Sequence, residues 1–296
     1  RARQRFAMIA PKEIHPAKTW PWILLFLVLL FGALLIPQIY RFTLDWDLRL
    51  AWWFNSLLGT NKMLDLTIAH LNSKNGDRAI AVGFCLFFLI HSLCGGNRNE
   101  ICRRMAFWGA VSIFFIILYQ GQRVLEDLYS RNSPARVLDG WFDLSKAYDM
   151  KVKTRNSSSW PSGHSMAYYF VSFMALHRYR KLCAILLPIA LVFPTTRIAS
   201  GAHWPSDIFL GALPLALLFA ALCYETPLWN LNRFLEMVCL KAMDIPMARH
   251  SRPFRERFAS AWAEFFEATP RSERLRLQGI PGCSENCPEP KSPPEV

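Results

Sequence analysis

The chain has 296 residues, of which 52% are hydrophobic and 19% charged, and its formal net charge is +12. A mean hydropathy of +0.15 is high for a water-soluble protein of this length. Several apolar stretches approach the about 20 residues that cross a bilayer. The basic residues flank those stretches, as in membrane proteins with Lys/Arg-rich cytoplasmic loops, which argues against nucleic-acid binding.

Six apolar stretches predict an all-α integral membrane bundle of six transmembrane helices. In chain order they cover residues 20–40, 79–94, 105–119, 164–177, 182–194 and 208–224. The first stretch is too long for a cleavable signal peptide and has no small-residue cleavage site, so we expect a retained span.

The same pattern predicts four regions along the chain. These are a basic cytoplasmic N-terminus (1–19), a six-span membrane domain (20–229), an amphipathic cytoplasmic tail (230–280) and a disordered tail (281–296). Disorder is expected in the last region because Pro, Ser and Glu dominate it.

Two aromatic segments are predicted to lie along the membrane surface. Residues 44–58 mix tryptophans with charges, which is typical of a helix at the headgroup level on the outer side. In the tail, one helical face carries Phe254, Phe258, Trp262, Phe265 and Phe266. That face predicts either an amphipathic helix on the cytoplasmic leaflet or a helix packed against the base of the protein.

The distribution of Lys and Arg predicts the orientation. Basic residues concentrate in the N-terminus, after the second span, after the fourth span and in the tail. With six spans these segments fall on one side, so both termini are expected in the cytoplasm of a bacterial-type inner (plasma) membrane. The other loops carry mixed charge and face the periplasm or exterior.

The eight cysteines lie within the predicted spans or in the predicted cytoplasmic segments. Proteins in oxidising spaces usually place disulfide cysteines in outer loops, so no disulfide is expected. The Cys283-x3-Cys287 pair has no second pair or histidines nearby, which argues against a zinc site.

A first polar motif, Pro161-Ser162-Gly163-His164, precedes the fourth span. The backbone N–H groups of Ser162 and Gly163 at a helix start are predicted to bind phosphate, and Gly163 allows close approach of an oxyanion. His164 is the candidate general acid, because its ring titrates near neutrality. In isolation, Pro-Ser-Gly would only indicate a turn before a helix.

A second motif, Arg197 followed by His203 and Asp207, lies against the sixth span. Ionisable groups this close to hydrocarbon mark a functional site by default. His203 is the predicted nucleophile, forming a phosphohistidine, and Asp207 is expected to fix its tautomer. Arg197 offers a charged fork for phosphate oxygens. The alternatives are that Asp207 only caps the helix, that His203 is an interfacial histidine and that Arg197 snorkels to the membrane surface.

Further basic residues are candidate phosphate contacts. Arg123 and Arg131 are eight positions apart and would share one face of a helix. Arg123 alternatively pairs with a neighbouring acidic residue. The basic residues at positions 151, 153 and 155 are either phosphate contacts or part of a solvated loop.

Arg-x5-His-x3-Asp after Pro-Ser-Gly-His resembles the second and third signatures of the type 2 phosphatidic acid phosphatase superfamily. The first signature, Lys-x6-Arg-Pro, is matched imperfectly by Arg123 and Arg131: the spacing is one residue longer, arginine replaces lysine and the proline is displaced. The resemblance covers residues 123–211. Residues 45–58, 131–134 and 201–204 are similar to bacterial lipid A phosphotransferases and undecaprenyl-diphosphate phosphatases. The resemblance to these families implies a six-helix bundle, no metal or other cofactor, and a pocket open to the outer leaflet.

The predicted function is therefore metal-independent removal or transfer of phosphate from a lipid phosphate or diphosphate. The alternative is a non-catalytic phospholipid-binding or transport membrane protein. A transporter would more often show Gly/Pro-interrupted spans in matching halves, and the sequence contains no such repeat. The histidine motifs also resemble those of soluble vanadium-dependent haloperoxidases. The six apolar stretches argue against that chemistry here, because a soluble enzyme has no use for membrane spans. The lipid, the acceptor and the oligomeric state are left open.

Overall fold

A computed structural model describes residues 18–242 of the chain. In this range every regular element is helical apart from one isolated antiparallel bridge, Ser73–Val152. The elements are α2 (Trp20–Leu34), α3 (Pro37–Ser56), α4 (Lys62–Leu71), α5 (Lys74–Leu93), α6 (Arg98–Leu128), α7 (Pro134–Val137), α8 (Leu144–Ala147), α9 (Gly163–Arg178), α10 (Arg180–Ala199), the π-helical η1 (Asp207–Ala212), α11 (Leu213–Glu225), η2 (Pro227–Trp229) and α12 (Asn230–Ala242). The all-α prediction is confirmed.

Six complete spans are not confirmed. Four segments in the described range are long and apolar enough to cross a membrane: α5, α6, α10 and the continuous η1–α11. A fifth is reached only if the bent pair α2–α3 is one span. Helices α2 and α9 have 15 and 16 residues, or about 22 and 24 Å at 1.5 Å per residue, less than the about 30 Å hydrocarbon core.

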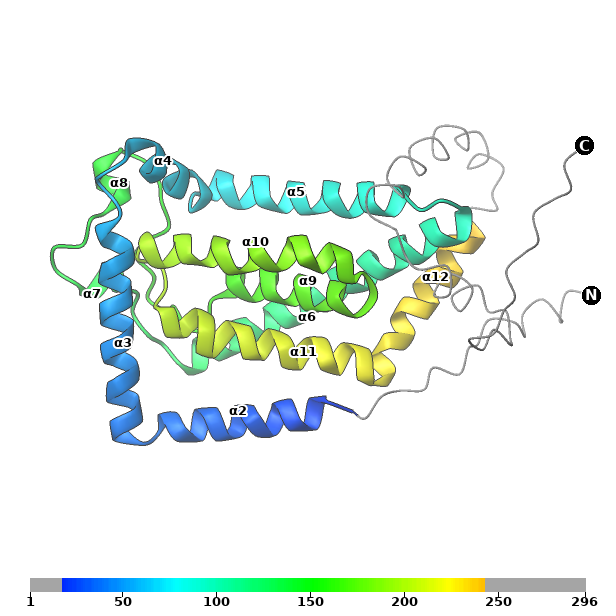
Figure 1. The fold of residues 1–296 in the computed structure, drawn as a ribbon, viewed down its shortest axis with the longest axis horizontal. Helices are drawn as coiled ribbons and strands as arrows, with labels where there is room; N and C mark the ends of the chain where they lie inside the picture. The colour runs from blue at the N-terminus through cyan, green and yellow to red at the C-terminus, as the bar shows by residue number, and fades with distance from the viewer. Residues whose placement is uncertain (1–17, 243–296) are drawn as a thin grey trace, which may run out of the picture.

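The predicted first span, residues 20–40, is interrupted. Helix α2 ends at Leu34, and Pro37 opens α3 after a bend of 91° between the two helix axes. Proline is favoured in the first turn of a helix, and it lacks the N–H that would extend the hydrogen bonds of α2, so a break is favoured here. Figure 1 shows α2 running along the bundle and α3 crossing its end.

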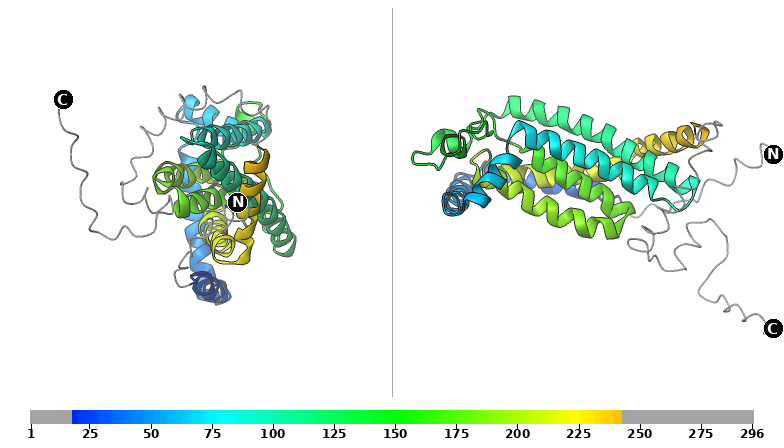
Figure 2. Two further views of the ribbon diagram at one scale, coloured as in Figure 1. Left: turned by 90° about the vertical axis from the view of Figure 1, so that its right-hand side faces the viewer. Right: turned by 90° about the horizontal axis from the view of Figure 1, so that it is seen from above.

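The two ends of the bundle differ. One end is bounded by α3, α4, α7 and α8, and we call it the α3 end; the start of α2 and the whole of α12 lie at the opposite end (Figures 1 and 2). The predicted surface segment 44–58 falls mostly within α3. There Trp46 and Trp53 are 53% and 56% exposed, as expected for aromatic residues at a membrane interface.

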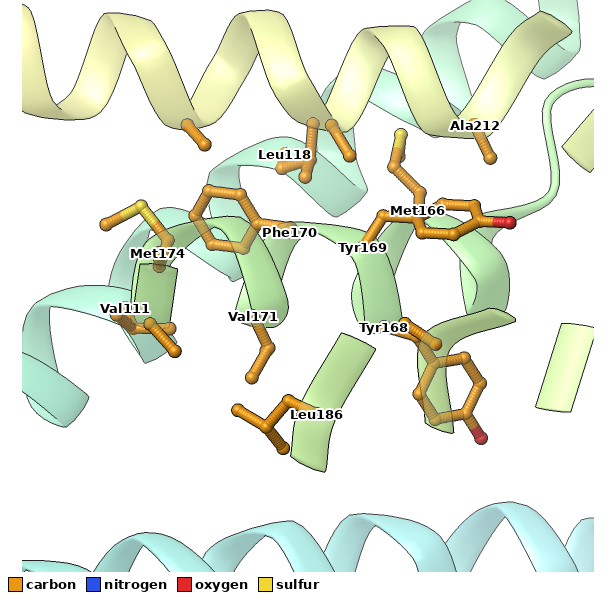
Figure 3. Close-up of a cluster of buried hydrophobic side chains, with 14 of the residues drawn as sticks. Val111, Leu118, Met166, Tyr168, Tyr169, Phe170, Val171, Met174, Leu186 and Ala212 are labelled. Atoms are coloured by element: carbon orange, nitrogen blue, oxygen red, sulfur yellow. The ribbon is translucent and has the colours of Figure 1, made fainter. Parts of the chain in front are cut away.

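Helix α9 forms the centre of the core. Its side chains Met166, Tyr169, Phe170 and Met174 are at most 1% exposed. Figure 3 shows them among residues from α6, α10 and η1, which include Val111, Leu118, Leu186 and Ala212. A helix packed on all sides cannot shift without opening cavities. Its first turn, which contains His164, is therefore held in place.

The cysteine and tail predictions are tested only in part. Cys85, Cys94, Cys102, Cys183, Cys223 and Cys239 are free thiols. The Cys283–Cys287 pair and the aromatic tail face at 254–266 lie outside the described residues. Between residues 18 and 242 no three His, Cys, Asp or Glu side chains gather in a metal-binding arrangement.

Candidate active site

A tight turn at the end of α10 brings His203 back beside Arg197. Gly201 has a φ of +79°, and a Cβ there would lie 2.5 Å from Trp141 Nε1, so only glycine fits. The carbonyl of Gly201 accepts the N–H of Ala135 at 3.1 Å, and the backbone N–H of His203 donates to the carbonyl of Arg197 at 3.3 Å. One short segment therefore holds both functional residues.

The His203 ring is buried and oriented by a backbone group. Its Nδ1 lies 2.7 Å from the carbonyl oxygen of Ser159, so Nδ1 carries the proton and Nε2 keeps its lone pair. The nearest oxygen of Asp207 is 3.8 Å from Nδ1, beyond hydrogen-bonding distance. Burial lowers the pKa of His203 to about 3, and the charge of Arg197 acts in the same direction. His203 is thus a neutral imidazole with a free Nε2.

Asp207 acts on the backbone rather than directly on His203. Its Oδ2 accepts the N–H of Trp204 at 2.7 Å, and its Oδ1 lies 3.3 Å from Nη1 of Arg131. The expected hydrogen bond from the imidazole to Asp207 is replaced by the bond to Ser159, because Trp204 and Arg131 already occupy the carboxylate. Asp207 opens η1, a π-helical turn of the kind common at functional sites, and its carboxylate binds the N–H of a residue that precedes this turn.

Arg131 connects α3 to η1. Its Nη2 donates to Asp47 Oδ2 at 2.6 Å and its Nη1 to Ser206 Oγ at 2.7 Å, and the guanidinium lies 4.8 Å above the Trp204 ring. Burial alone would lower the pKa of Arg131, but the carboxylates of Asp207 and Asp47 outweigh it and raise the pKa. Direct phosphate binding by Arg131 stays a prediction, because these partners already engage both Nη atoms.

Arg197 and His164 form the contact at the centre of the site. Nη2 of Arg197 lies 2.7 Å from Nδ1 and 3.2 Å from Nε2 of His164, and Nη1 donates to Asn72 Oδ1 at 2.9 Å. Arg197 is only 6% exposed, so it points inward and does not snorkel to the membrane surface.

The Arg197 guanidinium still has a donor for an anion. Its buried Nε has no partner among residues 18–242. A cavity of about 10 Å³ beside it is lined in part by His164 and Tyr168 and holds about one water molecule. A phosphate group is larger than this space, so binding requires some of the lining side chains to move.

The Pro161–His164 motif packs against η1 and α6. The Ser162 N–H donates to the carbonyl of Asp207 at 3.2 Å, so it is not the free phosphate donor that the sequence predicts. Gly163 begins α9, where first-turn N–H groups have no partner within the helix. A Cβ on Gly163 would lie 3.0 Å from Oε1 of Gln122. Glycine is therefore favoured at this position because α6 approaches closely.

Arg123 does not reach the site. It is exposed, its Nη2 donates to the hydroxyl of Tyr119 at 3.2 Å, and its guanidinium lies 5.1 Å above that ring. The expectation of a shared helical face with Arg131 is wrong, because α6 ends at Leu128 and the helical relationship ends with it. The α6 side chain that contacts the first motif is Gln122, which donates to the carbonyl of Pro161 at 3.2 Å.

Of the predicted basic loop, one residue joins the site. Lys153 forms an ion pair with Asp77, whereas Arg155 pairs with Asp143 at 3.4 Å, and Lys151 is exposed. Lys153 is therefore linked to the site indirectly, because its partner Asp77 lies beside His164.

The sequence prediction missed four partners of the site: Asn72, Asp77, Asp47 and Ser159. Asp77 Oδ1 lies 3.0 Å from Nε2 of His164. A signal for Asp77 existed, since it is a carboxylate at the edge of the second apolar stretch, which is the criterion that selected the two motifs. Asp47, within the aromatic segment 44–58, carries a similar signal, whereas the uncharged Asn72 and Ser159 carry none.

Comparisons with known proteins found the following similarities. Residues 108–231 match the family model described as PAP2 superfamily. The protein named Lipid A 1-diphosphate synthase, from Escherichia coli (strain K12), is 26% identical over 204 residues, which cover 67% of this chain and 84% of that protein. A solved structure entitled "Crystal structure of Aquifex aeolicus LpxE" is 21% identical, with a TM-score of 0.40, and covers 60% of this chain and 94% of that one.

The motifs and the matched segment define an enzyme of the lipid phosphatase and phosphotransferase class. The segment that matches the PAP2 superfamily model contains all three motif regions, so the resemblance drawn from the motifs is confirmed. Asn72 and Asp77 lie outside it.

Proposed function

We propose that this protein is a metal-independent enzyme that removes or transfers phosphate from a lipid phosphate or diphosphate through a phosphohistidine on His203. The observation that carries the proposal is the position of Arg197. Its guanidinium contacts His164 at 2.7 Å, and its backbone carbonyl accepts the N–H of His203 at 3.3 Å. The charge of Arg197 also acts on both imidazole rings, which supports the proposal that the nucleophile and the general acid flank one phosphate-binding guanidinium.

In the first step, Nε2 of His203 attacks phosphorus and the bond from phosphorus to the leaving oxygen breaks. His164 gives a proton to that oxygen, which departs as an alcohol or a phosphate. The Ser159 carbonyl, 2.7 Å from Nδ1, stabilises the ring as it becomes positively charged. Arg197 holds the phosphoryl oxygens, where fixed donors contribute most of the catalysis.

In the second step, water or a phosphate oxygen of a second lipid attacks the phosphohistidine. His164 takes the proton when water is the acceptor, and the bond between phosphorus and His203 Nε2 breaks. Hydrolysis and transfer therefore share one intermediate, and the acceptor that reaches it decides the product. The E. coli relative is named for the synthesis of lipid A 1-diphosphate, so lipid A is a candidate substrate, beside polyprenyl diphosphates and phosphatidyl-type lipids.

We place the α3 end at the outer face of a bacterial-type inner membrane. The exposed tryptophans of α3 suit a headgroup layer, and the basic segments predicted to be cytoplasmic flank the opposite ends of the helices. The site would then take its substrate from the outer leaflet.

The proposal is tested with the purified full chain in detergent, using lipid mono- and diphosphates in the presence of EDTA. Released phosphate and phosphorylated lipid are both measured by mass spectrometry. We expect activity in EDTA and an acid-labile phosphoprotein that disappears in His203→Gln.

The matched control is His177→Gln, which removes a histidine from the other end of α9, where it packs 4.2 Å from the Tyr224 ring. The control is expected to stay active. Full activity of His203→Gln would rule out the nucleophile, and loss of activity in EDTA would contradict metal independence. Binding of every lipid without turnover would favour the non-catalytic alternative.

A further inference from the structure

We infer that Asp77, on α5, is a positioning residue that orients His164 and stabilises its protonated form. This inference rests on the proposed function, in which His164 is the general acid. Asp77 lies outside the segment that matches the superfamily and outside both histidine motifs.

The contact between the two side chains is direct. Asp77 Oδ1 lies 3.0 Å from Nε2 of His164, and the Asp77 side chain is 19% exposed. This oxygen is buried and accepts no hydrogen bond from the described residues, so it contacts His164 as a charge partner rather than as an aligned acceptor. Arg197 lies nearer to Nδ1, at 2.7 Å. One ring nitrogen thus faces a carboxylate, while the other faces the place where phosphate would bind.

The charges around His164 give Asp77 a specific task. Arg197 from α10 and Lys153 from the loop before α9 are both cations that act on His164, and Asp77 is the carboxylate that opposes them. A general acid must carry two ring protons before it donates one. Without Asp77, the two cations would disfavour that doubly protonated ring.

The α4–α5 corner is built to hold this carboxylate. Ser73 caps α5 by accepting the N–H of Gly76 at 3.0 Å, which places Asp77 in the first turn. The Lys153 N–H donates to the carbonyl of Asn72 at 2.9 Å, and Lys153 also pairs with Asp77.

The same corner also positions Arg197. The Asn72 side chain accepts from Arg197 Nη1 at 2.9 Å. One corner therefore orients both the general acid and the phosphate-binding arginine.

The test compares leaving groups in Asp77→Asn. With a lipid phosphate, whose leaving oxygen needs a proton, we expect kcat to fall about 10–100-fold with KM little changed, a part of the about 10²–10⁴-fold that a general acid supplies. With para-nitrophenyl phosphate, whose leaving group departs without a proton, the loss should be under about threefold. An equal loss with both substrates would mean a structural role and overturn the inference.

The pH profile gives a second readout, with opposite signs for two variants. Asp77→Asn removes the negative neighbour, so the basic limb of kcat should move to lower pH. Lys153→Met removes a cation and frees Asp77, so the limb should move to higher pH. The second variant keeps the inference testable if Asp77→Asn does not fold; no shift, or a shift to lower pH, in Lys153→Met would overturn it.

Two further variants distinguish a failure of the proposed function from a failure of the role of Asp77. Asp65→Asn removes another buried carboxylate, which accepts from the Tyr148 hydroxyl at 2.6 Å. Any loss of kcat in this variant should be equal for the two substrates. In a His164→Gln background, Asp77→Asn should cause no further loss. If His203→Gln is fully active, the proposed function fails. If His203→Gln and His164→Gln are inactive while Asp77→Asn matches wild type, only the role of Asp77 fails.

Discussion

Gly76 determines how closely α4 and α5 approach, so Gly76→Ala tests whether that approach matters to the site. A Cβ on Gly76 would lie 2.0 Å from the carbonyl oxygen of His70. Ordinary C–H···O contacts are about 3.3–3.6 Å, so α5 must move away from α4 by about 1.3 Å. That movement shifts Asp77, one residue further along, relative to His164.

The expected magnitudes differ for stability and activity. Overpacking of this kind costs about 1–3 kcal/mol, while alanine in place of glycine in a helix recovers about 1 kcal/mol. Because the atoms that the new Cβ would meet all belong to the backbone and cannot rotate aside, we expect the upper part of this cost and a clear fall in Tm. Activity is more sensitive, since a displacement of about 1 Å costs about 10²-fold in rate.

The assay measures kcat with a lipid diphosphate and Tm in detergent for Gly76→Ala and for Gly83→Ala. Gly83 lies on the same helix, and a Cβ there meets nothing within 4 Å. The control should keep wild-type kcat and gain up to about 1 kcal/mol of stability. Wild-type kcat in Gly76→Ala, or an equal loss in both variants, would show that the corner does not position the site.

Three other outcomes are expected. Arg131→Met leaves a buried carboxylate pair uncompensated and should destabilise the protein by about 3–5 kcal/mol, with partial recovery on adding Asp47→Asn; an unchanged Tm with a raised KM would instead support phosphate binding by Arg131. Asn72→Leu removes a partner of Arg197 and should raise KM about tenfold, roughly the value of one hydrogen bond to a charged group; equal KM values would contradict the contact. The folded-state pKa of His203 is about 3 against about 6.5 unfolded, so the unfolded state binds more protons and stability should fall as pH drops from 6.5 toward 3. The loss is at most about 5 kcal/mol, and an identical Tm–pH slope in His203→Gln would contradict it.

Contacts within a few residues could be read from spacing. Arg197 and His203 are six positions apart, and the tight turn between them fixes their relation whatever surrounds it. The apolar stretches likewise indicate a membrane helix bundle, because hydrocarbon demands backbone hydrogen bonds within the segment itself.

Contacts between distant segments depended on where helices end and how they pack. Arg123 loses its relation to Arg131 because α6 stops at Leu128, and the first span stops at Leu34 because Pro37 begins a new helix. No local spacing indicates that a backbone carbonyl, from Ser159, would orient His203. Nor does it indicate that the α4–α5 corner would bring Asp77 to His164, because packing side chains around α9 determines which helix ends meet.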